Sequence, residues 1–266
     1  MTLIAVAPNG ARKTKDDLPS IPLTPEEIAI EASACQRAGA AMIHLHIRDS
    51  IGRHSLNTAR YQETIKLIKE ETDNQLLIQV TSESVGKYST EEQFEMIHSL
   101  KPDAVSIAIR EIHNFNEIEI NENFNFMKAN NTSPQIILYN AHDVSIYKKW
   151  LEEGILPGKA YPVLYVIGKS QVEGVFSLDF FDQDYQLPAS SWMVCGFGES
   201  EFKIGVEAAK RGGHIRIGFE NNHVLEDGRI ANNNAELVSQ MVAHLAEQKR
   251  VLATHEEARK TMKPDW

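Results

Sequence analysis

Two histidines separated by one residue, His44 and His46, stand at the end of an apolar run. On a β-strand, residues two apart point to the same face, so both imidazoles converge on one point. Glu220, near the other end of the chain, offers a carboxylate as a third ligand. Two histidines and one carboxylate suit a catalytic zinc or iron, because a vacant coordination position then accepts water or substrate. We therefore predict a divalent metal site at these three residues.

A structural role is the alternative for the two histidines. A single strand histidine is usually a satisfied core or surface residue, whereas two on one apolar face would bury two polar rings that need partners. The spacing favours the metal site, although short motifs of this kind also occur by chance.

The elements that must position these residues alternate along the chain. Short β-rich runs are followed by longer amphipathic segments, which is the pattern of repeated βα units with parallel strands. Eight such units close a (β/α)8 TIM barrel, and about 250 residues is a common length for one. We predict an α/β fold with a single TIM-barrel domain over residues 1–266. The predicted strands are Leu3–Ala7, Ala41–His46, Leu76–Thr81, Ala104–Ile109, Gln135–Tyr139, Pro162–Ile167, Trp192–Gly196 and His214–Gly218.

Helical patterns lie between these strands. The first begins at Thr24, where an N-cap hydroxyl precedes a first-turn proline and a glutamate, and it ends at Gly39. The pattern is weakest over Lys169–Pro188, where a helix should follow the sixth strand. An open doubly wound sheet is the competing fold, but the glycine-rich dinucleotide fingerprint expected after the first strand is missing. The other predicted helices are Thr58–Glu71, Thr90–Leu100, Glu117–Ala129, Val144–Glu153, Glu201–Arg211, Ala235–Gln248 and Glu256–Met262.

The composition is that of a soluble globular protein, and it disfavours several partners. A formal net charge of −10 disfavours general affinity for nucleic acid or for an anionic membrane surface. No stretch approaches the roughly 20 apolar residues of a membrane span, and the first residues lack the features of a signal peptide. Two cysteines, Cys35 and Cys195, provide no disulfide framework, so we expect a cytoplasmic location.

Polar side chains recur where the predicted strands end. In TIM barrels the chemistry lies at the carboxyl ends of the strands, so residues at and just after these ends are candidates for the site. Arg216 and Asn221 flank the predicted ligand Glu220 and are the catalytic candidates. The candidates for binding substrate are Asn9, Arg12, Thr81, Ser82 and Ser106.

Other residues near the strand ends have a structural interpretation. Cys195 is disfavoured as a nucleophile, because no base for it is evident in the sequence. Arg48 and Asp49 are expected to form a supporting or helix-entry pair rather than to take part directly. His214, at the start of the eighth strand, is expected to be structural.

Five segments spread over the chain form a specific combination. They are Thr24–Glu27, Ala38–Ala41, His44–Asp49, Gly212–Asn222 and Asn234–Val238. This combination resembles the β-keto acid cleavage enzyme family, whose founding activity is cleavage of 3-keto-5-aminohexanoate. The resemblance covers nearly the whole chain. It implies a TIM barrel, usually a zinc-dependent homotetramer, that transfers a fragment of a small β-keto acid to acetyl-CoA and releases acetoacetate and a new CoA thioester.

The resemblance also implies roles for individual residues. His44, His46 and Glu220 would bind the metal, which would polarise the chelated keto acid as a Lewis acid. Arg216 matches an arginine that orients a catalytic carboxylate, and the hydroxyls of Thr81 and Ser106 match substrate contacts.

Four acidic positions of the family pattern are neutral or basic here. Asn221 replaces an aspartate after the metal-binding glutamate, Arg12 replaces an acid after the first strand, and Ala108 replaces one in the fourth. The acidic segment of the fifth strand is Gln135–Ile137. An amide does not act as a general base near neutral pH, so the sequence does not identify the proton acceptor. We predict a substrate without a cationic amine, with an added negative group attracted by Arg12.

Two other functions are compatible with this sequence. A metal-dependent hydrolase or aldolase is one, although the His-x-His pair of amidohydrolase-type barrels closes the first strand and this pair closes the second. A non-catalytic barrel that binds a keto acid is the other, and the loss of acidic residues motivates it.

Overall fold

The computed structural model describes residues 1–170, 172–183 and 187–266. Within these ranges, eight parallel strands pair in a closed ring, and β1 completes it by pairing with both β2 and β10. The predicted TIM barrel is confirmed, and each predicted strand overlaps an observed one. The strands are β1 (Ile4–Val6), β2 (Met42–Leu45), β5 (Leu77–Thr81), β6 (Ala104–Ala108), β7 (Ser133–Leu138), β8 (Tyr161–Ile167), β9 (Ala189–Gly196) and β10 (His214–Ile217).

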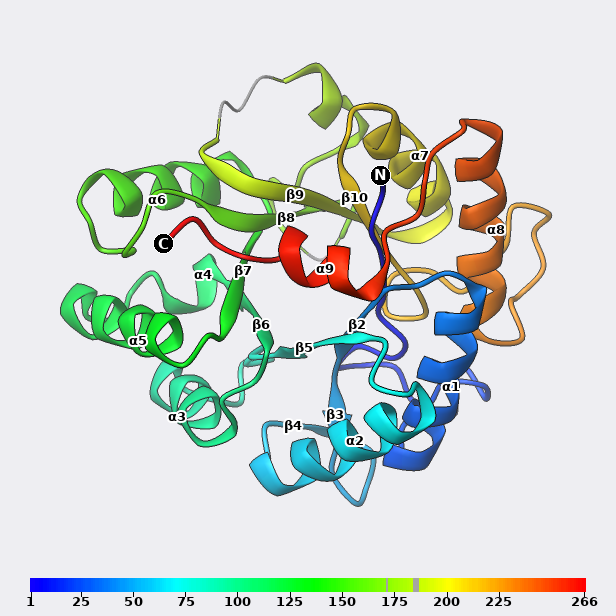
Figure 1. Cartoon of the computed structure of the whole chain (residues 1–266), viewed down its shortest axis with the longest axis horizontal. Helices are drawn as coiled ribbons and strands as arrows, with labels where there is room; N and C mark the ends of the chain where they lie inside the picture. The colour runs from blue at the N-terminus through cyan, green and yellow to red at the C-terminus, as the bar shows by residue number, and fades with distance from the viewer. Residues whose placement is uncertain (171, 184–186) are drawn as a thin grey trace.

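A ring of helices surrounds the barrel (Figure 1). Its members are α1 (Pro25–Ala38), α2 (Thr58–Glu71), α3 (Thr90–Leu100), α5 (Glu117–Ala129), α6 (Ala141–Glu152), α7 (Glu201–Lys210) and α8 (Asn234–Glu247). The local signals work as predicted in α1, where Thr24 and Glu27 form a capping box and Gly39 ends the helix with a φ of 117°. Among the described residues, no helix is both long and apolar enough to cross a membrane.

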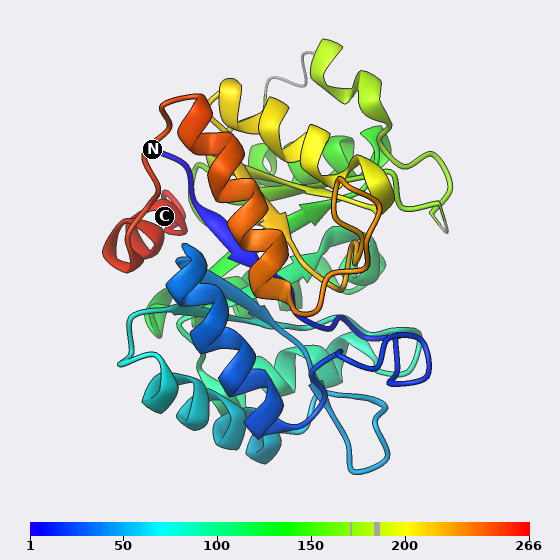
Figure 2. The same ribbon diagram turned by 90° about the vertical axis from the view of Figure 1, so that its right-hand side faces the viewer.

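The two ends of the barrel differ. Helix α9 (His255–Thr261) lies across the amino-terminal end, where Ala258 and Met262 join the same apolar cluster as Leu3 and Leu77. Figure 2 shows α9 at one end and the loops of residues 7–24, 46–57 and 218–233 at the opposite end. That opposite end is the carboxyl end of the strands, where TIM-barrel chemistry lies.

The alternation of β2 sets the orientation of the histidines. Ile43 and Leu45 belong to the apolar layer between strands and helices, whereas Met42 belongs to the cluster inside the barrel. Because side chains alternate along a strand, His44 and His46 share the inward face with Met42.

Several short elements were not predicted. They are the hairpin of β3 (Ile47–Arg48) and β4 (His54–Ser55), α4 (Ile109–Ile112), and the 3₁₀ helices η1 (Leu178–Asp182) and η2 (Gly198–Ser200). Elements of two to five residues are too short to show a periodicity. In the described part of Lys169–Pro188, η1 takes the place of the expected helix, while residues 171 and 184–186 lie outside the described residues.

Candidate active site and metal centre

The three predicted ligands meet at the carboxyl end of the barrel. Nε2 of His44 lies 3.1 Å from Nε2 of His46, and Oε2 of Glu220 lies 3.7 Å and 3.5 Å from these two nitrogens. That oxygen is buried and has no hydrogen-bond partner among the described residues. Around a tetrahedral zinc with bonds of about 2.1 Å, ligand atoms lie about 3.4 Å apart. The donor set therefore fits a divalent cation.

A tight turn after β10 brings Glu220 to this point. Gly218 has a φ of 135°, and a Cβ there would lie 2.5 Å from the carbonyl oxygen of Ala7. The N–H of Phe219 donates to Oδ1 of Asn234 at 2.7 Å, and the N–H of Glu220 donates to the carbonyl of Ala7 at 3.1 Å. Only glycine allows β1 and this turn to approach so closely.

A hydrogen-bonded chain inside the barrel sets the tautomer of His44. Its Nδ1 donates to Oε1 of Gln79 at 2.9 Å, and Nε2 of Gln79 donates to Oε1 of Gln135 at 2.9 Å. Nε2 of His44 therefore carries a lone pair, which faces Nε2 of His46. Burial, and after it the charge of Arg216, lowers the pKa of His44 well below its usual value, so the imidazole is neutral and able to bind a metal.

Arg216 is buried beside the cluster. Its Nη2 donates to Sγ of Cys195 at 3.2 Å and to Oε1 of Glu220 at 3.3 Å. Burial opposes ionisation of Glu220, but the charge of Arg216 holds the pKa of that carboxyl well below its usual value. Nε and Nη1 of Arg216 are buried and have no partner within the described part of the chain. This arginine thus holds the candidate ligand Glu220 in place.

Asn221 belongs to a buried polar network. Its Nδ2 donates to the carbonyl of Arg216 at 3.1 Å and to Oε1 of Glu201 at 3.4 Å, and its Oδ1 accepts from Sγ of Cys195 at 3.1 Å. Glu201, the first residue of α7, also accepts from the N–H of Gly218 at 3.1 Å and from Nδ2 of Asn222 at 3.3 Å. Burial raises the pKa of Glu201 to about 8. Both the nitrogen and the oxygen of the Asn221 side-chain amide therefore already have hydrogen-bond partners.

Cys195 is expected to resist alkylation in the folded protein. It is fully buried, and burial raises the pKa of its thiol to about 11, so the reactive thiolate is scarce at neutral pH. Iodoacetamide labelling followed by peptide mass analysis measures this, with urea-unfolded protein as the positive control. Rapid labelling of the folded protein would restore the nucleophile interpretation.

A cavity of about 460 Å³ opens beside the cluster and contains four of the predicted site residues, Asn9, Arg12, Glu220 and Asn221. Two lysines that are not among the predicted residues, Lys13 and Lys169, also line it. The complete lining is Asn9, Gly10, Ala11, Arg12, Lys13, Gly168, Lys169, Ser170, Phe197, Gly198, Glu220 and Asn221.

The three predicted hydroxyls lie outside this lining. Oγ1 of Thr81 accepts from the N–H of Glu83 at 3.1 Å, and Oγ of Ser82 donates to the carbonyl of Ser106 at 2.9 Å. Oγ of Ser106 is buried without a partner among the described residues. Of the three, Ser106 is the one whose hydroxyl has no hydrogen-bond partner in the described part of the chain.

Glu83 is an acidic residue at the site that was not predicted. Its Oε1 lies 2.9 Å from Nη1 of Arg12, and its Oε2 lies 3.9 Å from Nδ1 of His46. Three residues that were not predicted lie shortly after the end of a strand, namely Glu83, Glu201 and Lys169. This position could have identified them in the sequence as candidates for the site.

Arg48 and Asp49 do not form the expected pair. Nη2 of Arg48 donates to the carbonyls of Gly10 and Lys13 at 2.6 Å and 3.1 Å, whereas Asp49 pairs with Arg53 at 3.1 Å. Arg48 therefore holds the loop after β1 against the small hairpin. His214 accepts from the N–H of Leu3 at 3.2 Å, a structural contact at the amino-terminal end.

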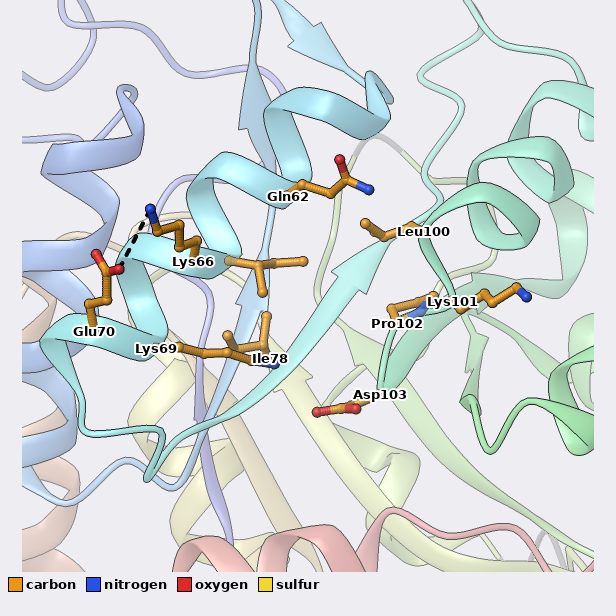
Figure 3. A pocket seen from close by; sticks show the side chains of 10 residues that line it. Gln62, Lys66, Lys69, Glu70, Ile78, Leu100, Lys101, Pro102 and Asp103 are labelled. Carbon is orange, nitrogen blue, oxygen red and sulfur yellow. Dashed lines mark ion pairs between the residues drawn. The ribbon is translucent and has the colours of Figure 1, made fainter.

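A separate cavity of about 480 Å³ lies between α2 and α3, towards the amino-terminal end of the barrel (Figure 3). Ile78 and Leu100 contribute apolar side chains, and both of its acids are paired, Glu70 with Lys66 at 3.8 Å and Asp103 with Arg259 at 2.9 Å. None of the predicted site residues lines it, so it is distinct from the candidate active site.

Fold and site together define a TIM-barrel enzyme with a candidate metal centre at the carboxyl ends of its strands. A model of the β-keto acid cleavage enzyme family matches residues 1–263, and the chain belongs to this family.

Two similar sequences and one similar structure were found. A 3-keto-5-aminohexanoate cleavage enzyme of Acetoanaerobium sticklandii is 30% identical over 98% of this chain and 97% of its own length. A 3-oxoadipate:acetyl-CoA acetyltransferase of Cupriavidus necator is 26% identical over 97% of this chain and 93% of its own. A solved structure of ObcA, a ternary complex with C4-CoA adduct and oxalate, covers 92% of this chain and 67% of ObcA at 16% identity, and its TM-score of 0.70 shows a shared fold.

Proposed function

We propose that this enzyme transfers a fragment of a small β-keto acid to acetyl-CoA, which releases acetoacetate and a new CoA thioester. The observation that carries the proposal is the convergence of His44, His46 and Glu220 beside a cavity with a basic rim. Membership of the family and the acetyl-CoA-dependent transfer named for the Cupriavidus relative support the same reaction class.

Zinc is the metal that we propose for the site, because two imidazoles and one carboxylate with an open position are a common zinc donor set. When bound, it would supply Lewis-acid polarisation of the ketone and carboxylate of the keto acid. The protein's own contribution would be to hold Glu220 through Arg216 and to offer the free N–H groups of Arg216 to the substrate. We also propose a homotetramer in the cytoplasm, which the resemblance to the family implies.

The substrate that we propose lacks a cationic amine. Arg12, Lys13 and Lys169 give the cavity a basic rim, and Glu83, which is not a candidate metal ligand, is paired with Arg12. A negative group on the substrate would compete with Glu83 for Arg12. Relative kcat/KM values over a panel of neutral, anionic and 5-amino β-keto acids test this idea, and a preference for the cationic 5-amino acid would contradict it.

Acetyl-CoA-dependent acetoacetate formation from the same panel tests the reaction itself. The zinc-loaded native protein is expected to form acetoacetate, and Glu220→Gln is expected to form none, because an amide is a far weaker metal ligand than a carboxylate. Arg259→Lys, at the amino-terminal end of the barrel, is the control for an unrelated substitution. Turnover that does not require CoA would favour a hydrolase, and keto acid binding without turnover would favour the binding barrel.

A further inference from the structure

The two candidate histidine ligands have unequal surroundings. Nδ1 of His44 donates to the amide oxygen of Gln79, whereas Nδ1 of His46 is buried and unpartnered among the described residues. Nε2 of His46 faces Glu220 at 3.5 Å, so its Nδ1 lies on the other side of the ring. Histidines that bind metals almost always donate their second N–H to a carboxylate, a carbonyl or a water molecule. An acceptor for His46 is therefore required.

Glu83 lies where such an acceptor is needed. Its Oε2 is 3.9 Å from Nδ1 of His46, which is longer than a hydrogen bond but short enough for a small side-chain rotation to close. The backbone of Glu83 is already fixed, since its N–H donates to Oγ1 of Thr81 at 3.1 Å and its carbonyl accepts from Nε2 of His54 at 2.7 Å. Only the side chain has to move.

Arg12 holds the other oxygen of Glu83. The pair spans the loops after β1 and β5 at 2.9 Å, and the Arg12 side chain is 64% exposed whereas that of Glu83 is 16% exposed. The inner oxygen of Glu83 is thus directed towards His46, and the outer one is bound by a cation at the rim. Arg12 restrains the carboxylate on the side away from the histidine.

We propose that Glu83 is a positioning residue for His46, and that its Oε2 accepts the Nδ1–H of His46 when a cation fills the metal site. This contact orients the imidazole and makes Nε2 a stronger donor to the metal. The proposal rests on the proposed metal-dependent function. The Nδ1–H of His46 would then donate to a charged carboxylate, whereas that of His44 donates to the neutral amide of Gln79.

Competition titrations of Zn²⁺ against a chromophoric chelator test the proposal without any assay of turnover. Glu83→Ala is expected to weaken zinc binding by about 10- to 100-fold, which is the usual effect of removing such a partner. Glu83→Gln keeps an acceptor without its charge and is expected to weaken binding less. Arg12→Gln frees the carboxylate and is expected to leave zinc affinity equal or higher.

Glu111→Gln is the matched control. Glu111 holds the same loop through Ser84 and Gln93, with hydrogen bonds of 3.0 Å and 2.8 Å, but it does not contact His46. If Glu83→Ala binds zinc as tightly as the native protein, or if Glu111→Gln or Arg12→Gln loses as much affinity, the proposal is wrong. If the native protein binds no zinc at all, the metal site itself is wrong, which is a distinguishable result. Thermal melts confirm that each variant is folded.

Discussion

Arg216→Lys is expected to lower kcat by about 100-fold or more, which is the scale of losing a preorganised charged donor. The guanidinium contacts Cys195 and Glu220 through one nitrogen and keeps two further N–H-bearing atoms for the site. Lysine places a single point charge on a flexible stem, so it cannot hold Glu220 and contact substrate in the same geometry. The positive charge is kept, so the buried carboxylate is not left without a cation, and the barrel is expected to stay folded.

Steady-state kinetics of acetoacetate formation measures this effect. Arg259→Lys is the control, because Arg259 makes an ion pair of 2.9 Å with Asp103 at the opposite end of the barrel and is expected to keep the native kcat. If zinc-loaded Arg216→Lys keeps the native kcat, Arg216 does not take part in the proposed reaction and its role is limited to packing.

The periodic parts of the fold were predictable from the sequence. Alternation in β2 places Ile43 in the outer layer and His44 inside, and the spacing of two brings Nε2 of His44 and His46 within 3.1 Å. The arrangement of loops was not predictable. Glu83 pairs with Arg12 across 71 residues, and only the closed barrel brings the two loops together. Loop side chains obey no period, so their partners follow from the fold alone.

The amide at position 221 is matched to its neighbours. Nδ2 of Asn221 faces two acceptors, Oε1 of Glu201 and the carbonyl of Arg216, while Oδ1 faces the thiol of Cys195. An aspartate would present lone pairs to both acceptors. The amide therefore fits the buried Glu201 and the carbonyl of Arg216 better than a carboxylate would.

Asn221→Asp is accordingly expected to lower the free energy of unfolding by about 3 kcal/mol, on the scale of an uncompensated buried charge, without creating a free general base. Two carboxyl groups at this distance share a proton, and the like charge raises the second of their two apparent pKa values further. Glu201 of the native protein already destabilises the fold as the pH rises from its unfolded pKa near 4.5 to the folded pKa of about 8. The additional loss in Asn221→Asp is therefore expected to grow above about pH 8. Urea unfolding below and above pH 8 measures this.

The double variant Asn221→Asp with Glu201→Gln tests the cause of this instability. It distinguishes repulsion between the two carboxylates from a general cost of burying a charge at position 221. Glutamine removes the second carboxylate, and its amide can donate to Asp in place of the lost contact, so the double variant is expected to recover most of the stability at high pH. If proton transfer in this barrel requires only a carboxylate at position 221, the double variant should also gain kcat over the native protein. Equal instability of the single and double variants would show that Glu201 does not set the residue at position 221.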